Sequence, residues 1–114
     1  MTPCKLALDL LSTVPNDEFI TGKFSDEIGK CCAIGHFKRL SSKNPSDYSM
    51  ENCSDREDNY PYLRQNVKYA MLKLHGTDRD LADVNNNRNV NGYTDRDIKT
   101  RVIQCLQDCV NAGF

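Results

Sequence analysis

The sequence has almost no net charge, no long hydrophobic segment and no convincing β-strand. Its 15 basic and 16 acidic residues give a formal net charge of −1, which does not favour binding to nucleic acid or to an anionic membrane. The first apolar run, residues 6–11, is interrupted by Asp9, and no small-residue cleavage site follows it. Such a run is neither a signal peptide nor a membrane-spanning helix. We therefore expect a cytoplasmic protein that binds no nucleic acid and no membrane.

Helical periodicity dominates the rest of the sequence. Apolar residues recur every three or four positions in residues 3–14, 24–42, 62–76 and 94–114, and residues 77–85 could add a short helix. Ser25 or Asp26 is the expected N-cap of the second helix, Thr77 or Asp78 that of the short helix, and Thr94 with Asp97 forms a capping-box pattern before the last. The expected buried stripes of the 62–76 helix and of the last helix are Leu63, Val67, Ala70, Met71 and Leu74, and Ile98, Val102, Cys105, Leu106, Cys109 and Val110. The length of 114 residues fits one domain, residues 1–114. We expect an all-α fold, a compact bundle of four to five helices with one long acidic loop.

The acidic loop covers residues 41–61 and shows no helical period. Long loops within compact domains are often functional, and tyrosines beside carboxylates form a usable recognition surface. The expected contact surfaces are the 47–62 segment of this region and a polar turn at residues 83–93. The candidate binding residues of the two segments are Asp47, Tyr48, Asp55, Glu57, Asp58, Tyr60, Asn85, Asn86 and Tyr93.

The stretch DVNNNRNVNG, residues 83–92, places an oxygen-bearing side chain at every second position, as a calcium loop does. An EF-hand loop that began at Asp83 would need Gly at its sixth position and a carboxylate at its twelfth. Those positions hold Arg88 and Thr94. Asn and Gly are also the residues that tight turns prefer. We therefore interpret the stretch as a polar turn and not as a calcium site.

The six cysteines are expected to be reduced thiols in a reducing compartment. Two chemical alternatives remain. If the protein is an enzyme, Cys32, His36, His75 and Asn85 are the candidate catalytic residues, since a thiol, an imidazole and an amide occur in the order Cys–His–Asn. If it binds zinc, two helical i, i+4 pairs could supply the ligands, namely Cys32 with His36 and Cys105 with Cys109.

Three segments, GKCCAIGHFKRL, DLADVNNN and KTRVIQCLQDCVNAGF, occur in this order over about 70 residues. Together they form the pattern C-x-x-G-[HA], then N-[DN], then R-V-[IL]. The pattern resembles a group of small uncharacterised bacterial and bacteriophage helical proteins without a known activity. The resemblance implies a bacterial or phage origin and marks Cys32, Gly35, His36, Asn85 and Asn86 as motif positions. It implies no mechanism.

The function expected from the sequence is that of a small non-catalytic interaction protein. It would bind a partner protein, as an inhibitor or adaptor does, through its loop surfaces. No cofactor is expected. A small-molecule ligand or a metal is the first alternative, and a cysteine-dependent hydrolase is the second.

Overall fold

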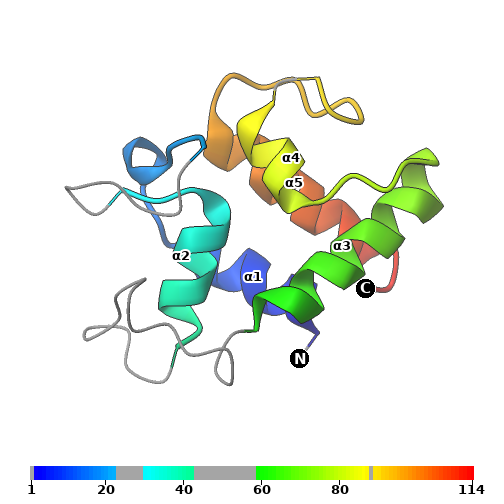
Figure 1. The fold of residues 1–114 in the computed structure, drawn as a ribbon, viewed down its shortest axis with the longest axis horizontal. Helices are drawn as coiled ribbons and strands as arrows, with labels where there is room; N and C mark the ends of the chain where they lie inside the picture. Colours follow the sequence, from blue (N-terminus) through cyan, green and yellow to red (C-terminus); the bar gives the residue numbers. More distant parts are fainter. Residues whose placement is uncertain (1, 23–29, 43–58, 88) are drawn as a thin grey trace.

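The computed structural model describes residues 2–22, 30–42, 59–87 and 89–114. These residues contain five α-helices, α1 (Pro3–Leu11), α2 (Ala33–Leu40), α3 (Tyr60–His75), α4 (Leu81–Asn86) and α5 (Ile98–Asn111), and a 3-10 turn, η1 (Asn16–Glu18). Within the same ranges, β-type pairing is limited to two isolated bridges. The predicted all-α bundle is confirmed (Figure 1). The expected acidic loop lies largely outside the described residues.

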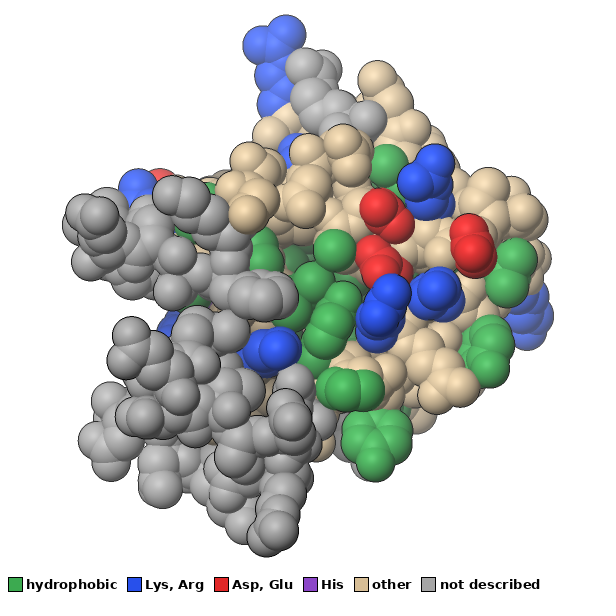
Figure 2. Space-filling view, viewed as in Figure 1, with side chains coloured by type: hydrophobic (Ala, Val, Ile, Leu, Met, Phe, Trp, Pro, Cys, Tyr) green, Lys and Arg blue, Asp and Glu red, His purple; other side chains and the backbone are tan. Residues whose placement is uncertain are grey.

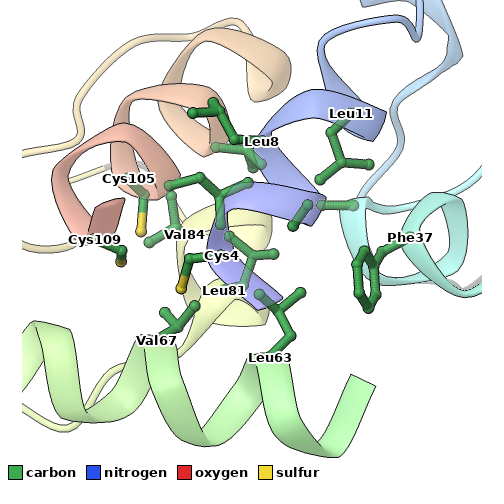
Figure 3. Close-up of a cluster of buried hydrophobic side chains, with 14 of the residues drawn as sticks. Cys4, Leu8, Leu11, Phe37, Leu63, Val67, Leu81, Val84, Cys105 and Cys109 are labelled. Atoms are coloured by element: carbon green, nitrogen blue, oxygen red, sulfur yellow. The ribbon is translucent and has the colours of Figure 1, made fainter. Parts of the chain in front are cut away.

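One hydrophobic core joins all five helices. Helix α1 packs against α2, α3 and α5, and α4 packs against α2, α3 and α5. Figure 3 shows side chains from all five helices converging on this core. Each fully buried large apolar side chain stabilises the fold by about 1.5–3 kcal/mol relative to exposure. The labelled members of the core are Cys4, Leu8, Leu11, Phe37, Leu63, Val67, Leu81, Val84, Cys105 and Cys109.

The first helix is shorter than the predicted 3–14 range. Thr2 caps its start, since Thr2 Oγ1 accepts a hydrogen bond from the Lys5 amide, and the helix ends at Leu11. Beyond that point the hydroxyl group of Ser12 donates to the Leu8 carbonyl, and that of Thr13 donates to the Leu10 carbonyl. Such bonds compete with helical backbone bonds, and they end the helix before Pro15.

The second helix does not begin at Ser25 or Asp26 as predicted, and these two residues lie outside the described ones. It begins at Ala33, because the preceding residues are held in an extended conformation. The amide of Cys31 donates to the Glu18 carbonyl at 3.1 Å, and its carbonyl accepts from the Ile20 amide at 3.0 Å. This pairing with the segment after η1 prevents helical geometry at Cys31. Cys32 consequently becomes the N-cap.

The third helix covers the predicted segment and begins two residues earlier, at Tyr60. Gly76 ends it as predicted, with a φ of 73° that suits glycine.

The N-caps predicted for the last two helices are wrong. Asp80, and not Thr77 or Asp78, caps α4 in a reciprocal capping box with Asp83. Asp97 is itself the N-cap of α5, so the helix starts later than Thr94 predicts. The predicted periods of α3 and α5 were correct, but the exact starts of the helices depend on contacts made elsewhere in the chain.

Candidate functional site

The three motif segments meet at Asn85, which is fully buried at the end of α4. Its Oδ1 accepts a hydrogen bond from the amide of Ala33, the first residue of α2, at 2.9 Å. Its Nδ2 donates to the Ile20 carbonyl at 3.0 Å and to Asn86 Oδ1 at 2.9 Å. Asn86 Oδ1 in turn accepts from the Gly22 amide at 3.0 Å. One amide side chain thus joins α4, α2 and the segment that follows η1.

Arg101 of α5, which is 3% exposed, holds the same region from the other side. Its Nε donates to the Val84 carbonyl at 2.6 Å, and its Nη2 donates to the Asn85 carbonyl. Its Nη1 donates to the carbonyls of Asp95 and Arg96 at 3.0 and 3.1 Å. A cation at the C-terminal end of α4 satisfies helix carbonyls that have no partner within the helix, and it also interacts favourably with the helix dipole.

Cys32 and His36 are likewise engaged in structural contacts. Cys32 Sγ accepts a hydrogen bond from the Gly35 amide at 3.5 Å, as an N-cap side chain does. The buried His36 ring donates from Nε2 to the Glu18 carbonyl at 2.8 Å, and Nδ1 accepts from Arg39 Nη2 at 3.2 Å. Burial lowers the pKa of His36, with a further contribution from the Arg39 charge, so the ring is neutral and both nitrogens are occupied.

The polar stretch that resembled a calcium loop directs its oxygens to different partners. Asp83 accepts from the Asp80 amide, Asn85 accepts from Ala33, and Asn91 accepts from the Thr77 hydroxyl at 2.7 Å. Asn89 and Asn91 have positive φ angles of 71° and 54°, which asparagine tolerates in tight turns. The predicted turn is only partly correct, because residues 83–86 form the end of α4 and the turn lies in residues 89–92. Arg88 lies outside the described residues.

The five described cysteines, Cys4, Cys31, Cys32, Cys105 and Cys109, are free and buried. The hydrogen bond with Cys109, together with burial, raises the pKa of Cys4. The hydrogen bond with Cys105 and burial raise the pKa of Cys109, and the bond with Cys4 offsets part of that increase. The two thiols are therefore protonated core side chains. The alternative zinc site is not formed, because the described residues contain no group of three or more His, Cys, Asp or Glu side chains that could hold a metal.

His75 lies at the end of α3 and contacts the turn that precedes α5. Its Nε2 lies 3.3 Å from the hydroxyl of Tyr93, and that hydroxyl donates to Asp108 Oδ2 at 2.6 Å. Burial and the Asp108 hydrogen bond raise the pKa of Tyr93, which stays neutral. This chain of bonds connects α3 to α5.

The alternative catalytic residues do not form a hydrogen-bonded thiol–imidazole–amide arrangement. In the part of the chain that the structure describes, neither the His36 imidazole nor the His75 imidazole is hydrogen-bonded to the Cys32 thiol. Asn85 orients no imidazole, since its amide bonds to Ala33, Ile20 and Asn86. The arrangement required of a thiol, a base and an orienting amide is therefore absent from these residues.

The outward side of α3 carries large apolar side chains in contact with solvent. Tyr62 is 65% exposed, Tyr69 53% and Leu72 48%, whereas most of the large apolar residues that the structure describes are buried. Tyr69 and Leu72 border an open depression of about 450 Å³. Figure 2 shows hydrophobic side chains next to Lys and Arg side chains over the area where Figure 1 places α3. We call this area the α3 surface, and it consists of Tyr62, Arg64, Gln65, Lys68, Tyr69, Leu72 and Asp78.

The polar groups of the α3 surface are only partly engaged. Arg64 Nε contacts Asp80 Oδ2 at 3.2 Å, while the Arg64 side chain remains 55% exposed. Gln65 Nε2 donates to the Tyr69 hydroxyl at 3.1 Å. Exposed tyrosine and arginine side chains are enriched at protein–protein contacts, where they contribute much of the binding energy.

Several predicted binding residues do not offer a free side chain. Asn85 is fully buried and Tyr93 is 6% exposed, so neither is available to a partner, which corrects the sequence-based assignment. Asn86 is exposed but bonds to the Gly22 amide, and Tyr60 is half-buried with Lys38 Nζ 5.6 Å from its ring centre. The remaining predicted residues lie outside the described ones, namely Asp47, Tyr48, Asp55, Glu57 and Asp58.

The α3 surface was missed as a site, although the sequence contains a signal for it. The predicted buried stripe of the 62–76 helix held five apolar residues, and Tyr69 and Leu72 do not belong to it. Large apolar side chains on the far side of an amphipathic helix indicate a second contact face. Leu74, which was assigned to the stripe, is 42% exposed.

No described helix has both the length and the apolar character required to cross a membrane. Comparison of the chain with protein-family models, with curated proteins and with solved structures finds no match. The function is therefore inferred from the residues and their geometry.

Proposed function

We propose that this protein is a small non-catalytic interaction protein, of bacterial or phage origin, that binds a partner protein through the α3 surface. The observation that carries the proposal is the exposure of Tyr62, Tyr69 and Leu72 on one side of a single helix. The exposure of such a group of apolar side chains to water is unfavourable. Covering them with another surface lowers the free energy.

The geometry of the remaining candidate residues supports a binding role over a catalytic one. Cys32 and Asn85 are buried, and their side chains hold the ends of α2 and α4 in place. The described part of the chain therefore acts as a scaffold that presents the α3 surface. Tyr60 and Tyr62, at the start of this helix, also end the 47–62 segment that we expected to bind a partner.

A small-molecule ligand is a weaker candidate for this place. The volume of about 450 Å³ lies within the range of ligand pockets, but the depression is open and is lined mainly by one helix. Ligand pockets usually enclose most of the ligand surface, which an open helix face does not do.

The proposal is tested by quantitative affinity capture with three immobilised proteins, each checked for folding by circular dichroism. They are the wild-type chain, the double variant Tyr69→Ala/Leu72→Ala, and a control with Lys5→Ala and Gln107→Ala on exposed positions of α1 and α5. We expect a protein that the wild type and the control retain and the α3 variant loses, and that the purified wild-type chain binds in calorimetry. Identical recovery by all three proteins would contradict the proposal.

A further inference from the structure

We propose that the α3 surface binds an acidic amphipathic helix of its partner protein. This inference rests on the proposed function and specifies the kind of partner. The partner helix would pack its apolar side along α3 and direct its carboxylates towards Arg64 and Lys68.

The spacing of the exposed residues fits a helix as the partner. Tyr62, Gln65, Tyr69 and Leu72 follow one another at intervals of three, four and three residues along α3. This is the interval at which two helices pack side by side, because it keeps one row of side chains turned towards the partner. At a rise of 1.5 Å per residue the row is about 15 Å long, which corresponds to about three turns of a partner helix.

The charge of α3 selects an acidic partner. The helix carries Arg64, Lys68 and Lys73 and contains no Asp or Glu. Arg64 and Lys68 line the depression beside Tyr69 and Leu72, and Asp78 lines it as well. The ion pair with Asp80 uses Nε of Arg64, and the two terminal nitrogens of a guanidinium carry four further N–H groups. Carboxylates on a partner helix would therefore meet two cations at the edge of the apolar contact.

Charge and apolar exposure argue against two other occupants. A second copy that packed its α3 against this α3 would bring two cationic helices together, and like charges in a contact are unfavourable. A nucleic acid would cover the exposed side chains of Tyr69 and Leu72 less well, because its phosphate backbone offers no apolar side as an amphipathic helix does.

The test uses two synthetic 18-residue helical peptides with a fluorescent label. Both have leucines at intervals of three and four residues; one carries glutamates on its flanks, and the other carries lysines at the same positions. Binding is measured by fluorescence anisotropy for the wild-type protein, for Lys68→Glu and for Tyr69→Ala. The control is Lys5→Glu on α1, because it makes the same change in net charge at an exposed position far from α3 in the sequence.

We expect the wild type and Lys5→Glu to bind the acidic peptide and not the basic one. Lys68→Glu should weaken acidic-peptide binding at least tenfold and should gain affinity for the basic peptide, and Tyr69→Ala should weaken it at least tenfold. Three results would overturn the inference. They are equal binding of both peptides, unchanged binding by Lys68→Glu, and no binding of the acidic peptide at millimolar concentration.

Two further measurements identify the competing occupants. A concentration-dependent dimer in analytical ultracentrifugation that Tyr69→Ala abolishes would assign the surface to a second copy. Displacement of the acidic peptide by a single-stranded oligonucleotide with a higher affinity would assign it to nucleic acid. If the peptide fails while affinity capture still depends on Tyr69 and Leu72, the partner class is wrong and the proposed function stands. If capture does not depend on these residues either, both proposals fail.

Discussion

Replacing Asn85 by alanine removes the side chain that joins three segments of the fold. The amide accepts one hydrogen bond, from Ala33, and donates two, to the Ile20 carbonyl and to Asn86. In the variant the buried Ala33 amide loses its partner at the first turn of α2, where no helix carbonyl can replace it. The Ile20 carbonyl is partly exposed, so water can compensate part of its loss.

The expected destabilisation follows from these losses. An unsatisfied buried backbone group costs about 1–3 kcal/mol, and the partly exposed carbonyl and the space left by the amide add about 1 kcal/mol each. The total is about 3–5 kcal/mol, a large part of the stability of roughly 5–15 kcal/mol that is typical of a domain. For a chain of 114 residues this corresponds to a decrease in melting temperature of about 12–20 °C.

The assay is urea denaturation followed by circular dichroism at the helical minimum, with thermal melting as a second measurement. Asn111→Ala is the matched control, because Asn111 is exposed near the end of α5, and its loss should change stability by less than about 0.5 kcal/mol. Asn85→Asp should also destabilise the protein at neutral pH, because it places a carboxylate oxygen where the amide nitrogen now faces the Ile20 carbonyl. A loss below about 1 kcal/mol for Asn85→Ala, similar to that of the control, would refute the structural role.

Three further predictions concern single contacts. The pKa of His36 is lower in the folded protein than its ordinary value of 6.5 in the unfolded chain, so the unfolded chain binds a proton more readily. The contribution of His36 to the free energy of unfolding is therefore present above about pH 6.5 and is lost as the pH falls. His36→Gln should reduce the dependence of the free energy of unfolding on pH, measured by urea titrations between about pH 7.5 and 5.5, by at most about 1.4 kcal/mol per pH unit. An unchanged pH dependence would contradict the assignment. Arg101→Met should destabilise the protein by about 3–5 kcal/mol in the same assay, because the variant leaves buried helix carbonyls without a donor; a change within error would disprove the capping role. Gly76→Ala should cost about 1 kcal/mol through the positive φ alone, because no atom lies within 4 Å of the added methyl group, and Gly76→Asn should cost less.

The helix count and the core could be predicted from the sequence because both depend on local periodicity. The stripe of α5, with Val102, Cys105, Leu106 and Cys109, was predicted, and these residues are buried as expected. Arg101 was not predicted to be buried, because a charged residue beside that stripe is ordinarily on the solvent side. The carbonyls that make the burial of Arg101 favourable lie at the C-terminal end of α4 and in the segment before α5.

The start of α2 shows the same limit of local information. Residues 24–32 contain a plausible N-cap and a helical apolar pattern, which predicted a longer helix. The backbone pairing of Cys31 with Glu18 and Ile20 prevents helix formation at that residue, and it joins segments more than ten residues apart. The spacing of apolar residues along a helix cannot predict such a pairing, because the spacing depends only on neighbouring positions.

The sequence by itself determined that this chain forms a helical bundle, since apolar spacing and capping residues act over a few neighbouring positions. Its Asn and Gly residues also predicted a polar turn in the 83–92 stretch, where Asn89 and Asn91 adopt positive φ angles, whereas residues 83–86 belong to α4. The tertiary structure alone decided which polar residues hold the fold together and which face solvent. Asn85 is a buried connector and Tyr69 an exposed side chain because hydrogen-bond partners and neighbouring helices come from distant parts of the chain.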